Sequence, residues 1–295
     1  MNFKNIRAFR VEETPAPEML HQALKGGLFT ECSKGMPYSA GFVPPLQNGE
    51  LMGHTANGRT LICFQRQEKV IPPASLSELV QKKVAEIKHT ESRSVRRKER
   101  QQIREEVLFS ILPTALIKTT RTWAFFSHGW LFIGEASMRK AEEVIIRLRE
   151  ALESAGLSLR LSLPFPANSP RVVMTEFAAT GAPLSIDIGT TFDLEGSSHE
   201  VIRCRNEGVD STAVQEHIRS GFLISKMRME YDERVEFTLT DDLSLRRISL
   251  TDGALEGVDE AEDAEAEFHA LFFVTSTEIA GVWNWVIHTF GVEEG

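Results

Sequence analysis

The chain has 295 residues, of which 42% are apolar and 25% are charged, and its formal net charge is −9. This length and composition are typical of a folded protein with one large core or two ordinary ones, and they exclude intrinsic disorder. The N-terminal residues alternate between polar and apolar, and no apolar run approaches the roughly eighteen residues that span a membrane. We therefore expect a cytoplasmic protein without a secretory signal or a membrane anchor.

Residue types that bind metals or cofactors show no recognisable arrangement. The three cysteines, Cys32, Cys63 and Cys204, are far apart and form no C-x-x-C pair, so neither a disulfide framework nor a cysteine zinc site is predicted. The eight histidines are scattered, and the chain has no H-E-x-x-H, P-loop or G-x-S-x-G motif. We expect no cofactor and no bound metal.

The two signs of charge are segregated along the chain. Residues 256–267 include seven acidic side chains. Between Lys82 and Arg104, in contrast, nine basic residues accompany only three acidic ones. Because a surface field depends on where the charges lie, the negative net charge does not exclude a polyanionic partner.

The N-terminal part of the chain predicts strands and one short helix. Residues 6–11 resemble a strand, and residues 15–27 have helical spacing and end in two glycines. A β-hairpin follows, in which Asn57 and Gly58 supply the positive backbone angles of a tight turn. These elements form the first part of the expected body, residues 1–74.

Two helices are predicted between residues 75 and 113. Apolar residues recur at helical spacing from Leu76 to Ile87 and again from Ile103 to Ile111, and Val95 is the only strongly apolar residue between Lys88 and Gln102. A helix pair that loses its buried stripe in the middle is most simply an arm. We expect the arm to leave the body, to turn near residues 89–94 and to return.

The returning helix is predicted to carry a stripe of five arginines. Their spacing of i, i+3, i+4, i+7 and i+11 places them on one helical face. Like charges at these spacings repel, so the stripe is explained if an anion lies beside it, and a row of phosphates has a suitable geometry. The alternative is a solvated face that neighbouring glutamates partly neutralise. The five residues are Arg93, Arg96, Arg97, Arg100 and Arg104.

The remaining part, residues 114–295, is α+β in pattern. Strands are predicted at 114–126 and 130–136, followed by a helix that begins at Met138 with Ser137 as its cap. The whole chain therefore predicts an α+β fold with antiparallel sheets, flanking helices and a projecting helical-hairpin arm.

Further along, a short helix at 211–221 precedes a meander of three antiparallel strands over residues 222–250. Asp241 and Asp242 are expected in one of the turns of this meander.

After the acidic segment, residues 268–275 read as a buried strand. Thr275 and Glu278 then resemble a capping box for a final helix, whose apolar face over 279–290 is expected to be core and not a membrane anchor.

Five segments of the chain together form a recognisable pattern. They are GFVPP (41–45), HTANGRTLICFQRQEKVIP (54–72), RKERQQIREEVLFSILP (97–113), EASMRKAEEVIIRLREAL (135–152) and VIRCRNEGVDSTAVQEHIRSG (201–221). In order and with similar spacing, they resemble segments of the bacterial recombination-associated protein RdgC family, and the resemblance extends over nearly the whole chain. It implies a DNA-binding protein without sequence specificity, which forms a dimer closed into a ring around duplex DNA and restrains the recombinase RecA by occupying or competing for its DNA. Binding of single-stranded DNA remains open.

The resemblance also implies which basic residues line the inner wall of the ring. In the arm these are Arg96, Arg97, Lys98 and Arg100, and elsewhere they are Lys69, Arg205, Lys226, Arg246 and Arg247. The charge pattern of the arm adds Lys82, Lys83, Arg93 and Arg104. We call these thirteen residues the predicted DNA-binding set.

Four positions depart from the family pattern. Thr114 stands where the family usually has arginine, and Leu116 replaces a phenylalanine that resembles a dimer-closing contact. Asn206 and Glu207 replace a basic residue and a glutamine. These changes bear on the strength of DNA binding and on one dimer interface, for which Leu116 is the predicted contact residue.

Two other functions are compatible with the sequence. A metal-dependent nuclease needs converging carboxylates, for which Asp187, Asp193, Asp241 and Asp242 are candidates, although nothing in their spacing selects them. An interaction protein could dock a basic partner through residues 256–267, but a solvated loop is the simpler interpretation. We expect a non-enzymatic, nucleoid-associated protein whose partners are DNA and a second copy of the chain.

Overall fold

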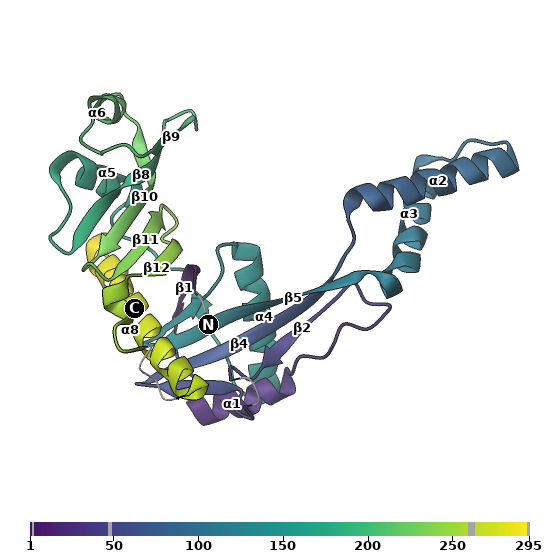
Figure 1. The fold of residues 1–295 in the computed structure, drawn as a ribbon, viewed down its shortest axis with the longest axis horizontal. Helices are drawn as coiled ribbons and strands as arrows, with labels where there is room; N and C mark the ends of the chain where they lie inside the picture. The colour runs from purple at the N-terminus through teal and green to yellow at the C-terminus, as the bar shows by residue number, and fades with distance from the viewer. Residues whose placement is uncertain (2, 47–48, 259–262, 294–295) are drawn as a thin grey trace. The chain divides into compact units, whose positions relative to one another are not determined.

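The computed structural model describes residues 1, 3–46, 49–258 and 263–293 of the chain. The chain forms two compact units (Figure 1). We call them the first unit, which comprises Met1–Gly26, Pro44–Cys63 and Thr122–Gly295, and the second unit, which comprises Gly27–Val43 and Phe64–Arg121. The predicted division into three parts, with boundaries after residues 74 and 113, stays a prediction.

The protein has an α+β fold with a large sheet of 12 strands. The strands are β1 (Asn5–Val11), β2 (Tyr38–Val43), β3 (Gly53–Ala56), β4 (Arg59–Val70), β5 (Leu116–Ser127), β6 (Trp130–Ile133), β7 (Leu161–Ser162), β8 (Ile186–Glu195), β9 (Val201–Arg205), β10 (Leu223–Tyr231), β11 (Val235–Thr240) and β12 (Leu245–Leu250).

Eight α-helices accompany these strands in the part of the chain that the structure describes. They are α1 (Pro17–Gly26), α2 (Pro73–Glu91), α3 (Arg97–Ile111), α4 (Met138–Ser154), α5 (Pro170–Thr180), α6 (Thr212–Arg219), α7 (Asp252–Leu255) and α8 (Ala264–Phe290), and a 3₁₀ turn, η1 (Leu112–Thr114), follows α3.

The strand order is β2-β4-β5-β6-β1-β12-β11-β10-β8-β9, with β3 beside β4 and β7 beside β1. In the first unit β1 pairs antiparallel with β6 on one side and with β12 on the other. The predicted meander is confirmed, since β10 pairs with β11 and β11 with β12, again antiparallel (Figure 1). The α+β class with a large antiparallel sheet is therefore confirmed, whereas the projecting arm and the ring-shaped dimer stay predictions.

Several local predictions are confirmed at the level of single residues. Asn57 and Gly58 have φ angles of 47° and 71°, as the tight turn between β3 and β4 requires. Helix α4 begins at Met138 after Ser137, and its predicted apolar stripe is buried. Asp241 lies in the turn between β11 and β12.

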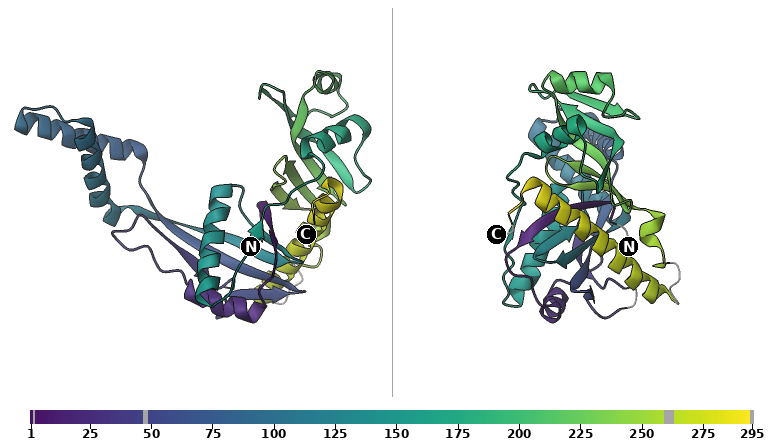
Figure 2. Two further views of the ribbon diagram at one scale, coloured as in Figure 1. Left: turned by 180° about the vertical axis from the view of Figure 1, so that it is seen from behind. Right: turned by 90° about the vertical axis from the view of Figure 1, so that its left-hand side faces the viewer.

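The predicted strand at residues 268–275 is wrong, because these residues belong to α8, which runs unbroken from Ala264 to Phe290 (Figure 2). The side chain of Asp263 caps this helix by accepting hydrogen bonds from two backbone N–H groups, at 3.0 and 2.8 Å. An apolar run of this kind has no period that separates a strand from a buried helix. Thr275 is accordingly a buried residue inside the helix and not its cap.

Helix α8 is the only helix within the described ranges that is long and apolar enough, by length and composition, to cross a membrane. Its apolar side chains nevertheless pack into the core of the first unit. Trp283 meets Trp130 of β6 with ring centroids 5.1 Å apart, and Phe272 meets Phe125 of β5 at 6.1 Å. These contacts are those of a core helix.

In the second unit, α2 and α3 pack against each other through a small apolar cluster. Leu76, Val80 and Val84 recur every four residues along α2 and are buried, and Ile103 of α3 is buried against them. The two predicted helices between residues 75 and 113 are thus present, and their packing fixes which faces of the pair meet solvent.

Candidate nucleic-acid interface

The predicted stripe of five arginines is wrong for two of its members. Helix α3 begins at Arg97, whereas Arg93 lies in the connection from α2 and Arg96 has the extended backbone of the residue before a helix, with φ −80° and ψ 162°. Neither residue can therefore lie on a helical face with the others. The prediction assumed a continuous helix from Arg93 to Arg104, but residues 92–96 are not helical.

An ion-pair network explains why Arg93 stays in this connection. Its guanidinium donates to Glu91 at 2.5 Å and to Glu99 of α3, with Nη1 2.8 Å from Oε2. Glu99 also accepts from the backbone N–H of Arg96 at 3.4 Å, near the start of the helix. The hydrogen bonds from Arg93 hold the pKa of Glu99 below its usual value. Arg93 is thus engaged in shaping the turn between the two helices.

Two lysines of α2 are also paired with carboxylates. Lys82 lies 2.9 Å from Glu78, and Lys83 lies 3.3 Å from Glu86, each within the same helix. Such exposed pairs stabilise a helix little, but they reduce the charge available to a partner. The charge pattern alone places both lysines in the predicted DNA-binding set.

Three arginines of α3 remain on one face and line a groove between the two helices. Arg97, Arg100 and Arg104 occupy positions i, i+3 and i+7, and no ion pair involves them among the described residues. The groove has a volume of about 340 Å³. Its other lining residues are neutral, and they are Ser77, Val80, Gln81 and Gln101. We call this feature the α2–α3 groove.

The chemistry of the α2–α3 groove suits an anionic polymer. Guanidinium groups, amides and a hydroxyl are the donors that bind phosphate and sugar oxygens without reading a base sequence. From Arg97 to Arg104 the helix rises by about 10 Å. This length corresponds to about three phosphates of one strand, at roughly 3.4 Å each.

Other members of the predicted DNA-binding set in the second unit lie outside this groove. Arg96 and Lys98 are exposed beside the start of α3 but do not line it. Lys69, near the end of β4, is partly buried, and its backbone N–H donates to the carbonyl of Pro37 at 2.8 Å.

In the first unit, two predicted cations share one buried carboxylate. Arg205 of β9 and Lys226 of β10 lie 2.9 and 3.1 Å from the two carboxylate oxygens of Asp193, which is only 4% exposed. Burial raises the pKa of Asp193, but the hydrogen bonds from Arg205 and Lys226 outweigh it, so the pKa lies below its usual value. Much of the positive charge of this pair is therefore compensated within the unit.

Sequence reasoning missed Arg203, which lies two residues before Arg205 on β9. It is exposed, pairs in register with Asp193, and has no ion-pair or hydrogen-bond partner among the described side chains. Residues two apart on a strand point to the same face, so the alternation in VIRCR was the signal that could have found it. Arg203 is therefore more available to a partner than Arg205, which is paired with Asp193.

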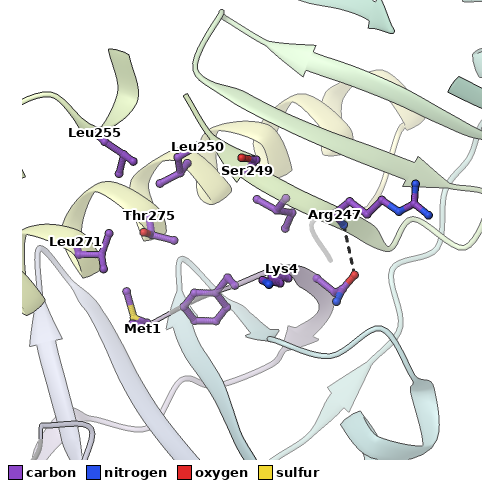
Figure 3. Close-up of a pocket in the computed structure, with 11 residues that line it drawn as sticks. Met1, Lys4, Arg247, Ser249, Leu250, Leu255, Leu271 and Thr275 are labelled. Atoms are coloured by element: carbon purple, nitrogen blue, oxygen red, sulfur yellow. Dashed lines mark hydrogen bonds between the residues drawn. The ribbon is translucent and has the colours of Figure 1, made fainter. Parts of the chain in front are cut away.

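Arg246 and Arg247 lie on β12 and differ in their surroundings. The side chain of Arg246 donates to the hydroxyl of Ser244 at 3.2 Å. Arg247 has a φ of 51°, in the left-handed region, and its backbone N–H donates to Asn5 at 3.4 Å. Figure 3 shows that its side chain extends away from Leu250 and Thr275, which line a cavity of about 540 Å³ beside it. The guanidinium thus points out of that cavity.

The carboxylates nominated for a nuclease are held by basic or hydroxyl groups instead of facing one another. Asp242 accepts from Arg7 at 2.8 Å, and Asp241 accepts from Nε of Arg171 at 2.7 Å. Burial raises the pKa of Asp242, but hydrogen bonds from Thr240, Ser244 and Arg7 outweigh this effect. The pKa of Asp242 therefore lies far below its usual value.

Asp193 is held by Arg205 and Lys226. Asp187, which is exposed on β8, is the one of the four candidates without a basic partner among the described residues. Within the ranges that the structure describes, no three metal-binding side chains are gathered in one place.

The positions that depart from the family pattern lie at the surface. Leu116, the first residue of β5, is 80% exposed. Thr114 is in η1, and its hydroxyl donates to the carbonyl of Ile111 at 3.2 Å. Asn206 has a left-handed backbone just after β9, and Glu207 follows it.

The acidic segment at 256–267 falls partly outside the described residues, because 259–262 are not among them.

Comparison with known proteins gives one consistent result. A family model described as "Putative exonuclease, RdgC" matches residues 1–293. A protein of Halorhodospira halophila named recombination-associated protein RdgC is 30% identical, with 97% of both chains covered. Proteins with the same name from Tolumonas auensis and Edwardsiella ictaluri are 27% and 29% identical, and 95% and 99% of this chain is covered.

Proposed function

Because the chain belongs to the RdgC family, whose curated relatives are named recombination-associated proteins, we propose that it binds DNA without sequence specificity and modulates recombination by RecA. The observation that carries this proposal is the α2–α3 groove, in which Arg97, Arg100 and Arg104 form no ion pair with any described carboxylate. An acidic protein that leaves three like charges side by side gains stability when an anion lies between them.

The absence of sequence preference follows from the donors of the groove. Arginine, glutamine and serine side chains contact phosphate oxygens, which are the same for every sequence. The groove is short, so it neutralises only about three phosphates of one strand. We propose that further cations of the first unit, with Arg203 and Arg247 the most available, extend the contact along the DNA.

We propose that the functional form is a dimer that encloses duplex DNA. A two-fold dimer uses the same surface patch twice, and Leu116 is the residue that we assign to one such patch. Its exposure of 80% at the start of β5 leaves a large apolar side chain in water, which a second copy would cover. A closed ring would hold DNA by topology as well as by charge.

The proposed effect on recombination follows from the occupancy of DNA by the protein. A protein that covers duplex DNA without regard to sequence competes with RecA for the same substrate, and no direct contact with RecA is needed. We propose a nucleoid-associated location for the same reason. Single-stranded DNA offers the same phosphates, so we expect the groove to bind it too, with a smaller salt dependence per phosphate.

An exonuclease is the alternative that the description of the family model suggests. Such an enzyme needs carboxylates that converge on metal ions. Asp193, Asp241 and Asp242 are instead engaged by Arg205, Arg171 and Arg7. This arrangement favours a binding protein over a nuclease.

The proposal is tested by binding to a fluorescent random-sequence duplex over a series of salt concentrations, with shuffled duplexes as competitors. We expect log affinity to fall linearly with log salt, by about 0.9 for each phosphate neutralised. Shuffled competitors should displace the probe equally well. A flat salt response, or a strong preference for one sequence, would remove the proposal.

A further inference from the structure

Two histidines from separate elements of the first unit lie side by side near the start of α8. Nε2 of His54, on β3, is 3.2 Å from Nδ1 of His269, in the second turn of α8. The two rings are nearly perpendicular, with an angle of 83° and centroids 5.2 Å apart. Neither histidine belongs to the predicted DNA-binding set or to the α2–α3 groove.

The separation of these nitrogens suits a metal ion. In tetrahedral zinc sites each histidine nitrogen lies about 2.0–2.1 Å from the ion, so two such nitrogens lie about 3.3 Å apart. The observed 3.2 Å is close to that value. In this structure the N–H of one ring donates a hydrogen bond to the facing nitrogen of the other. If that ring moves its proton to its second nitrogen, both facing nitrogens become lone-pair donors and both rings stay neutral.

The surroundings of His54 favour this neutral state. Phe268 and Phe272 pack edge-on against its ring, with centroids 5.4 and 5.8 Å away. A neutral imidazole is the form that binds a metal. His269 is exposed, which gives an ion a route to the pair.

Glu265 lies one helical turn before His269, on the same face of α8, and is exposed. The three donors are not already gathered around one point, since the described residues contain no such cluster. The carboxylate of Glu265 therefore has to rotate toward the ion, and water completes the coordination. Both movements involve exposed side chains or solvent.

We propose that His54 and His269 form a clamp for Zn²⁺ between β3 and α8, with Glu265 as the third ligand. Two imidazoles and one carboxylate are a donor set that zinc uses, whereas Mg²⁺ prefers oxygen ligands alone. The ion joins the hairpin of β3 and β4 to the first turns of α8. None of these three residues lines the α2–α3 groove.

The test is a calorimetric titration of metal-free protein with Zn²⁺, and with Mg²⁺ as a control, at neutral pH. We expect a single zinc ion per chain and no magnesium binding. The ion should be lost in His54→Gln and in His269→Gln, and Glu265→Gln should weaken the affinity without removing the ion. His89→Gln changes an exposed histidine at the end of α2 and should bind zinc as the unchanged protein does.

Glutamine keeps a hydrogen-bonding side chain and, at the three helical positions 89, 265 and 269, a good helix propensity, so each variant should fold. Thermal melting without metal checks this, and zinc should raise the melting temperature of the unchanged protein but not of His269→Gln. An unchanged protein that binds no zinc overturns the proposal. So does a zinc ion that persists with equal affinity in both histidine variants.

Discussion

The guanidinium of Arg93 closes onto Glu99 across the turn between α2 and α3, with Nη1 2.8 Å from Oε2. This pair draws Arg93 away from the arginines of α3 and leaves Arg97, Arg100 and Arg104 as the groove-lining charges. The structure thus divides one basic segment into cations that hold the helix pair together and cations that remain available to a partner.

Arg93→Gln tests this division. We expect the variant to bind random-sequence DNA with an affinity within about two-fold of the unchanged protein, because the lost charge is already paired. The melting temperature should fall slightly, since Glu99 loses its partner near the start of α3. Fluorescence anisotropy and thermal melting measure the two effects. A large loss of affinity would return Arg93 to the DNA-binding surface.

Asp193→Asn tests the buried carboxylate that Arg205 and Lys226 share. The variant keeps the shape of the side chain but loses both ion pairs, and we expect the free energy of unfolding at neutral pH to fall by about 1–2 kcal/mol. Urea unfolding measures the change. Asp187→Asn, an exposed change on the same strand, is the control and should be neutral.

The difference between Asp193→Asn and the unchanged protein should depend on pH. The pKa of Asp193 is lowered in the folded state, so its stabilising contribution is complete above the unfolded-state pKa of about 3.9. That contribution is lost as the pH falls through the lowered folded-state value. The two proteins should therefore converge in stability below about pH 4. A difference that is constant down to strongly acidic pH would show that charge is not its source.

Leu116→Asp tests the assembly. If the exposed side chain of Leu116 is covered by a second copy, a charge there should shift the mass in solution from dimer toward monomer while the melting temperature of the monomer holds. Light scattering gives the mass. Leu184→Asp, at a fully exposed leucine of the first unit, is the matched control. An undiminished dimer that stays on circular DNA would show that Leu116 is not the contact.

Incubation of labelled linear DNA with the protein and Mg²⁺ or Mn²⁺ tests the nuclease alternative. We expect the DNA to remain intact, because Asp241 and Asp242 are committed to Arg171 and Arg7. Gel electrophoresis over time measures the outcome. Degradation that disappears in Asp242→Asn, with DNA binding retained, would make the protein an enzyme.

The fold could be predicted where local chemistry is specific. Asn57-Gly58 identifies a hairpin turn, and Ser137 precedes a helix whose apolar stripe is unambiguous. The prediction for residues 268–275 failed because a short apolar run is compatible with a strand and with a helix, and the cap at Asp263 was the signal that distinguishes the two. The cap marks the start of the helix that contains these eight residues, six of which are apolar.

The sequence located the candidate site to a basic segment of the chain, but it did not identify which side chains of that segment line the groove. Arginine spacing placed Arg97, Arg100 and Arg104 on one face correctly, because these residues lie within α3. It failed for Arg93, whose partners, Glu91 and Glu99, become neighbours only when the chain turns. Which charges remain unpaired is a property of tertiary contacts, and sequence spacing does not contain it.

The most direct test of the account is the salt dependence of DNA binding by the triple variant Arg97→Gln, Arg100→Gln, Arg104→Gln. We predict a loss of affinity for all sequences and a salt slope smaller by about 0.9 for each phosphate contact removed. Thermal stability should hold or rise slightly, because three mutually repelling charges disappear and glutamine suits a helix. A triple variant with unchanged affinity and an unchanged slope would show that these arginines face only water, and would contradict the account.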